Sequence, residues 1–145
     1  MRPVEVLSVE DNRGDVVLMR EAMRKASLPY RVTVISDGVE ALDFLHRRGA
    51  HARAPRPELI LLDLKLPGRT GGEVLEDLRS DPSLRGIPVV LLSSSQSELE
   101  RASSYELPVG CSFVKPDSFE GYVAVVRAIE AFRQRLTTVR PHGDS

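Results

Sequence analysis

Five short, almost wholly apolar runs divide this chain of 145 residues, and their spacing limits the fold more than any other feature. The runs are rich in Val, Ile and Leu, as expected for strands buried on both faces of a parallel sheet. The segments between them are long enough for helices. The alternation therefore predicts an α/β domain with strands at Val4–Val9, Tyr30–Ile35, Leu59–Leu62, Ile87–Leu92 and Cys111–Val114.

Helical patterns follow each of the five runs. Apolar residues recur at three- and four-residue spacing over Gly14–Ala26 and Phe119–Leu136, and around Val74–Leu78. Asp37 with Glu40, and Ser97 with Glu100, have the spacing of helix N-caps and predict the starts of two shorter helices. Right-handed crossovers then put helices on both faces of the sheet. We expect a doubly wound domain over residues 1–137 and a C-terminal tail over residues 138–145.

Composition narrows the classes of function. The net charge is −1, so no overall basic field favours binding to nucleic acid or to an acidic membrane. The longest apolar runs are too short to span a bilayer, and the N-terminus lacks the pattern of a signal peptide. A single cysteine, Cys111, cannot form an internal disulfide. We expect a soluble cytoplasmic protein without direct nucleic-acid or membrane binding.

Polar residues stand directly after four of the five apolar runs. Glu10 and Asp11 follow the first run, Asp63 the third, Ser93 the fourth and Lys115 the fifth. In open parallel sheets, ligands bind beyond the carboxyl ends of the strands, and these ends share one edge. Each residue alone could equally be a turn, a helix cap or a solvated loop side chain. Their common position at one edge favours a site.

The residue types suggest a particular chemistry at that edge. Three carboxylates close together repel one another unless a positive charge lies among them. Oxygen ligands with open water positions suit Mg²⁺. Asp63 could then act as a nucleophile toward phosphorus, since carboxylates form aspartyl phosphates. Lys115 would add a positive charge, and Ser93 would offer a hydroxyl to a phosphoryl oxygen.

With these motifs the sequence resembles the receiver domain of two-component response regulators. The resemblance covers about residues 4–136 and is greatest to the stand-alone regulators paired with bacterial and cyanobacterial phytochromes. It implies a flavodoxin-like fold with strand order 2-1-3-4-5. The residues that carry it are Val9–Asn12, Asp15, Asp63–Gly68, Asp81–Pro88, Val89–Ser93 and Lys115–Pro116.

The resemblance also implies roles for individual residues. Asp63 would be the phosphoacceptor, and Glu10, Asp11 and the backbone carbonyl of Lys65 would join Asp63 in holding Mg²⁺. Ser93 would be the switch hydroxyl beside the phosphoryl group. Lys115 would be the lysine of the site, with a cis peptide bond to Pro116.

One position departs from the family. An aromatic switch residue usually stands three residues before the lysine, and this chain has Ser112 there. Phe113 follows one step later and should point to the other face of its strand. The signal is therefore expected to leave the site by another route, through the fourth helix or a dimer.

The fifth helix suggests a homodimer. Phe119–Leu136 has two neighbouring apolar lines, more than one core-facing stripe requires. One line could pack on the sheet while a second copy covers the other, although both could also form one wide core stripe. The expected upstream partner is a sensor histidine kinase, in particular a bacteriophytochrome. We expect no appended DNA-binding segment.

Two other functions remain open. A pseudo-receiver would keep the fold as an interaction module without phosphorylation, although the acidic set is intact. An aspartate-based, Mg²⁺-dependent phosphohydrolase would need a second aspartate two residues after the nucleophile, where this chain has Lys65. The preferred reading is a signalling receiver that catalyses only its own phosphorylation and dephosphorylation, and is otherwise no enzyme.

Overall fold

The computed structural model describes residues 2–102 and 109–139. All five predicted strand–helix pairs are present. β4 begins two residues later than predicted, after Pro88, which has no N–H to give to a sheet. The elements in chain order are β1 (Val4–Val9), α1 (Arg13–Lys25), β2 (Tyr30–Ile35), α2 (Gly38–Leu45), the 3₁₀ turn η1 (Gly49–His51), β3 (Leu59–Asp63), α3 (Gly71–Ser80), β4 (Val89–Ser93), α4 (Gln96–Ala102), β5 (Val109–Val114) and α5 (Phe119–Val139).

The strands form one parallel sheet in the order β2-β1-β3-β4-β5. This order confirms the flavodoxin-like topology that the family resemblance implied. The register pairs Val9 with Leu62 and Asp63 with Leu92. The carboxyl ends of β1, β3 and β4 are therefore level, and the polar residues that follow them lie at one edge.

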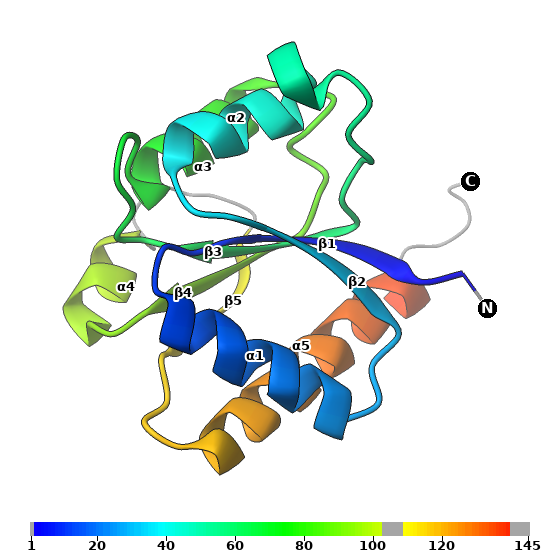
Figure 1. The fold of residues 1–145 in the computed structure, drawn as a ribbon, viewed down its shortest axis with the longest axis vertical. Helices are drawn as coiled ribbons and strands as arrows, with labels where there is room; N and C mark the ends of the chain where they lie inside the picture. Colours follow the sequence, from blue (N-terminus) through cyan, green and yellow to red (C-terminus); the bar gives the residue numbers. More distant parts are fainter. Residues whose placement is uncertain (1, 103–108, 140–145) are drawn as a thin grey trace.

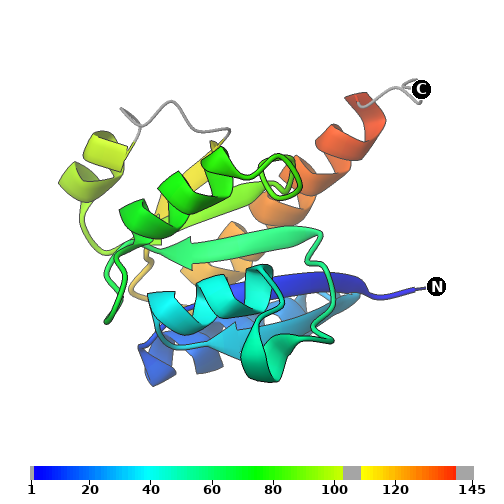
Figure 2. The same cartoon turned by 90° about the horizontal axis from the view of Figure 1, so that it is seen from above.

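Helices cover both faces of the sheet, with α2 and α3 on one side and α1 and α5 on the other (Figure 1). Successive strand residues supply alternate faces: Ile60 and Leu62 join the core under α2 and α3, whereas Leu59 and Leu61 join the core against α1 and α5. α4 lies beside β4 at the end where the strands terminate (Figure 2). Two cores thus fix the sheet that carries the site.

Side-chain caps fix where several helices begin. Asn12 caps α1 by accepting the Asp15 N–H, and Asp37 caps α2 by accepting the Glu40 N–H at 2.7 Å. The cap predicted for the fourth helix was placed two residues too late. Ser95, and not Ser97, accepts the N–H of the residue three positions on, which is Glu98. The spacing matched at both positions, but α4 begins at Gln96, so Ser95 is the residue directly before the helix.

α5 does not have the exposed apolar face that suggested a dimer. Tyr122, Val125, Ile129 and Phe132 of one line are buried, and so are Val123 and Val126 of the other. Both lines pack in the core against α1 and the sheet, because the helix lies along the sheet and is covered from two sides. They form one wide core stripe, which was the alternative interpretation. In the part of the chain that the structure describes, no helix is both long and apolar enough to cross a membrane.

Candidate functional site

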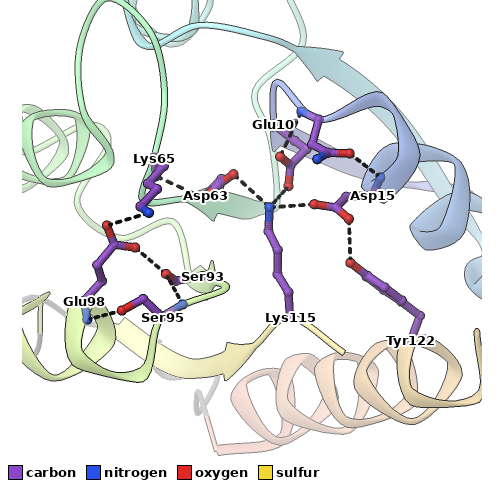
Figure 3. A network of polar contacts seen from close by, with 10 residues as sticks. Glu10, Asp15, Asp63, Lys65, Ser93, Ser95, Glu98, Lys115 and Tyr122 are labelled. Atoms are coloured by element: carbon purple, nitrogen blue, oxygen red, sulfur yellow. Dashed lines mark hydrogen bonds and ion pairs between the residues drawn. The ribbon is translucent and has the colours of Figure 1, made fainter. Parts of the chain in front are cut away.

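Lys115, directly after β5, lies at the centre of the site (Figure 3). Its Nζ is 2.9 Å from Glu10 Oε1, 2.8 Å from Asp15 Oδ2 and 2.9 Å from Asp63 Oδ2. The backbone N–H of Lys115 donates to the carbonyl of Ser93 at 2.8 Å and so continues the β4–β5 ladder. Burial opposes the charge of the ammonium, but the three carboxylates prevail and raise the pKa of Lys115 above its ordinary value.

Asp63 ends β3 and is held at both carboxylate oxygens. Oδ1 accepts the backbone N–H of Lys65 at 3.0 Å, and Oδ2 accepts from Lys115. The residue is only 4% exposed. A carboxylate with this burial and these two donors has a fixed orientation at the edge of the sheet.

Gly71, at the start of α3, allows the helix to approach this strand end closely. A Cβ at this position would lie 2.7 Å from the carbonyl oxygen of Asp63 and 2.6 Å from the Cα of Leu64. Any side chain there would push the helix off the backbone of the site. The Gly71 N–H donates to the Leu64 carbonyl at 3.1 Å, which ties the helix start to β3.

Glu10 is buried beside Asp63. Burial and contact with the Asp63 carboxylate raise the pKa of Glu10 to about 7, and Lys115 only partly offsets this. Its second oxygen, Oε2, accepts the backbone N–H of Asn12 at 3.1 Å. Two crowded carboxylates with one ammonium between them leave an excess of negative charge at the site.

The acidic residues have the spacing of a metal site. Glu10, Asp11 and Asp63 each offer a carboxylate oxygen, and these oxygens all lie within 4.8 Å of one another. Glu10 and Asp63 are buried, whereas Asp11 is exposed and leaves the group open on one side. An oxygen-only, partly open set of ligands suits a hard divalent cation that keeps some of its water.

Ser93, the last residue of β4, is buried and faces α4. Its Oγ donates to Glu98 Oε1 at 2.5 Å and accepts the N–H of Ser95 at 3.0 Å. Glu98 Oε2 is 4.0 Å from Lys65 Nζ. The hydroxyl predicted for the site thus lies at the correct edge, but its hydrogen is committed to the helix.

Three residues of this network were not assigned a role from the sequence. Asp15 binds Lys115, and its other oxygen accepts from the hydroxyl of Tyr122 at 3.1 Å. Tyr122 belongs to one of the two apolar lines predicted for the fifth helix, and it offered a usable signal because a buried tyrosine hydroxyl needs a partner. Glu98 has no comparable signal, because its contact depends on how α4 folds back toward β4.

The strand before Lys115 agrees with one expectation and contradicts another. Ser112 is exposed, and Phe113 packs into the core against α1 and α5, on the opposite face as predicted. The expectation of a cis peptide bond at Lys115–Pro116 is wrong, since the structure has no cis peptide bond within the described ranges. The trans form is favoured by about 0.5–1 kcal/mol for a bond before proline.

Fold and site together are typical of one class of protein: a five-stranded parallel sheet whose carboxyl edge carries a buried aspartate, a cluster of further acidic groups and a lysine. Residues 6–127 match the response regulator receiver domain family. This chain belongs to that family.

Its relatives include response regulators associated with phytochromes. The chain is 38% identical over 137 residues to response regulator Rcp1 of Synechocystis sp., covering 94% of this chain and 93% of Rcp1. The phosphorylated cyanobacterial phytochrome response regulator RcpA matches with a TM-score of 0.82 at 41% identity, covering 91% of this chain and 94% of RcpA. The bacteriophytochrome response regulator RtBRR matches with a TM-score of 0.77 at 37% identity, covering 95% of this chain and 93% of RtBRR.

A further match bears on the metal. The Mn²⁺-bound form of Rcp1 has a TM-score of 0.80 at 38% identity, covering 90% of this chain and 94% of that one. The protein is therefore a response regulator receiver, close to the phytochrome response regulators, and its acidic pocket has the form that suits a divalent cation.

Proposed function

We propose that Asp63 accepts a phosphoryl group from the phosphohistidine of a sensor kinase. A carboxylate oxygen of Asp63 would attack phosphorus, the phosphorus–nitrogen bond would break, and the histidine of the kinase would leave and take up a proton. The observation that carries this proposal is the fixed, buried Asp63 carboxylate, held between the Lys65 N–H and Lys115 beside two further acidic groups.

The metal proposed for the pocket is Mg²⁺. Glu10, Asp11, Asp63 and the backbone carbonyl of Lys65 would hold it, and when bound it would neutralise charge on the transferring oxygens. The close carboxylate oxygens of the first three support this set. Lys65 lies next to the pocket through its N–H contact with Asp63.

Lys115 and Ser93 would hold the product. The Lys115 ammonium stays charged at neutral pH, because its pKa is raised. It would move from Asp63 Oδ2 to a phosphoryl oxygen, a change of partner between neighbouring atoms. Ser93 would donate its hydroxyl hydrogen to a second phosphoryl oxygen, and the two donors would set how long the acyl phosphate survives.

The donor proposed here is a sensor histidine kinase, specifically a bacteriophytochrome. The kinase class follows from membership of the receiver family, and the phytochrome pairing is supported by the similarity to RcpA and RtBRR. We place this exchange in the cytoplasm, where such a kinase has access to ATP. The receiver itself would catalyse only its own phosphorylation and dephosphorylation.

A homodimer through α5 would need the outward, polar side of that helix, because its apolar side is buried. A substitution on the apolar side, such as Phe132→Asp, would disturb folding and would not test association, since Phe132 is a core residue. Sedimentation of the wild-type chain before and after phosphorylation tests association directly. A monomer under both conditions would exclude the dimer.

The proposed function is tested by incubating the protein with a small acyl phosphate donor. Wild type should take up one acid-stable, base-labile phosphoryl group in Mg²⁺ and none in EDTA. Asp63→Asn should take up none. Absence of uptake by wild type in Mg²⁺ would contradict the proposal, and continuous release of phosphate from many phosphate esters would indicate a phosphohydrolase instead.

A further inference from the structure

The hydroxyl of Ser93 is engaged with Glu98 in the unphosphorylated protein. Ser93 Oγ donates to Glu98 Oε1 at 2.5 Å, and the Glu98 carboxylate is mostly buried, with 19% of the side chain exposed. The same turn is joined by the Glu98 N–H to Ser95 Oγ and by the Leu99 N–H to the Ser95 carbonyl, both at 3.3 Å. The end of β4 and the first turn of α4 are thus one hydrogen-bonded unit (Figure 3).

This arrangement conflicts with a phosphoryl group on Asp63. A serine hydroxyl has one hydrogen to donate, so Ser93 cannot serve Glu98 and a phosphoryl oxygen together. A phosphoryl group also brings a charge of about −1.5 to −2 to the pocket, and the Glu98 carboxylate would then face it across Ser93. Both effects act against the Ser93–Glu98 contact.

We propose that Glu98 is a latch: it holds Ser93 away from the phosphoryl site in the resting state and couples loading of Asp63 to the first turn of α4. The inference rests on the proposed function. When Asp63 is loaded, Ser93 turns to the phosphoryl group and Glu98 loses its hydrogen-bond donor. Glu98 is a positioning residue, because it acts on the site through Ser93.

Two neighbouring features support this route. Lys65 Nζ is 4.0 Å from Glu98 Oε2 and mostly exposed, so it offers a released Glu98 a partner away from Ser93. On β5, Ser112 is small and exposed, and Phe113 packs on the opposite face. Because Ser93 is hydrogen-bonded to Glu98, the first turn of α4 is the segment that movement of Ser93 affects directly.

The test measures binding of trifluoroberyllate, a phosphoryl mimic, in Mg²⁺. Glu98→Ala should bind it about tenfold more tightly than wild type, because Ser93 no longer has to leave an acceptor; tenfold corresponds to about 1.4 kcal/mol. Glu98→Gln, which keeps an acceptor but loses the charge, should fall between the two. Glu100→Ala, an exposed glutamate on the same helix, is the charge control and should stay within about twofold of wild type.

A double mutant separates the latch from a general charge effect. In a Ser93→Ala background the gain from Glu98→Ala should largely disappear, because there is no hydroxyl left to release. Hydrogen exchange provides a second measurement: amides 96–99 should exchange faster in Glu98→Ala than in wild type, and wild type should approach the variant on adding trifluoroberyllate.

The outcomes distinguish this inference from the proposed function. If wild type binds trifluoroberyllate and Glu98→Ala binds it equally well, the latch is wrong and the proposed function stands. A full gain that persists in Ser93→Ala, or an equal gain in Glu100→Ala, also overturns the latch. If wild type and the Glu98 variants all fail to bind the mimic, the proposed function fails and the latch fails with it.

Discussion

Replacing Glu10 by glutamine should make the metal-free protein more stable at high pH. Burial and Asp63 raise the pKa of Glu10 from 4.5 to about 7, so the folded state holds the proton more tightly than the unfolded state. The contribution of Glu10 to stability is then greatest below pH 4.5, falls as pH rises toward 7, and stays low above it. At 1.36 kcal/mol for each pKa unit, this difference in pKa sets an upper limit of about 3 kcal/mol on the cost. Glu10→Gln has no charge to bury and so avoids this cost.

Urea unfolding in EDTA at pH 5 and pH 8 measures this effect. At pH 8 the variant should be about 2–3 kcal/mol more stable than wild type, and at pH 5 the two should be close together. Glu76→Gln, on the exposed side of α3, should change stability by less than about 0.5 kcal/mol at either pH. An equal effect of Glu10→Gln at both pH values, or a loss at pH 8, would refute the reasoning.

Three further changes test other parts of the structure. Tyr122→Phe removes the donor to Asp15 and should lower the free energy of unfolding by about 1 kcal/mol in urea; an unchanged value would show that this contact is not stabilising. Gly71→Ala should destabilise by about 1–3 kcal/mol and slow phosphoryl uptake, because its Cβ would collide with the Asp63 carbonyl, whereas Gly86→Ala, with open space around it, should do neither. Equal effects of the two alanines would contradict the packing argument. Glu130→Gln should cost about 1–2 kcal/mol at pH 7, because Arg133 holds the pKa of Glu130 down to about 2 from 4.5. The stability contributed by Glu130 is present above about pH 4.5 and is lost as pH falls toward 2. The difference in free energy of unfolding between variant and wild type should therefore vanish over this range. A difference that is constant with pH would contradict this role of Glu130.

The position of the site could be predicted because it follows from topology. Parallel strands bring their carboxyl ends to one edge, so residues directly after the strands must meet there. Glu10, Asp63 and Lys115 come together for that reason, although the first and the last are 105 positions apart in the chain. The apolar runs identify the strands that are buried in the sheet, and so they also identify the residues that meet at its carboxyl edge.

Other features depend on how the elements pack, and the patterns in the sequence do not reveal that packing. The apolar width of α5 fitted either a dimer face or a wide core stripe, and only the position of the helix against α1 decided between them. The hydrogen-bond partner of Ser93 also depends on packing. The motif indicates a hydroxyl at the site, but the path of the chain after β4 determines that Glu98 receives its hydrogen.

Chemical mapping of the phosphoryl group tests the central claim most directly. Borohydride reduces an aspartyl phosphate to homoserine, so peptide mass spectrometry after phosphorylation identifies the acceptor residue. The account predicts homoserine at position 63, dependent on Mg²⁺ and lost when the protein is treated with EDTA before the donor is added. Homoserine at another aspartate, or an unmodified residue 63 in protein that has taken up phosphate, would contradict it.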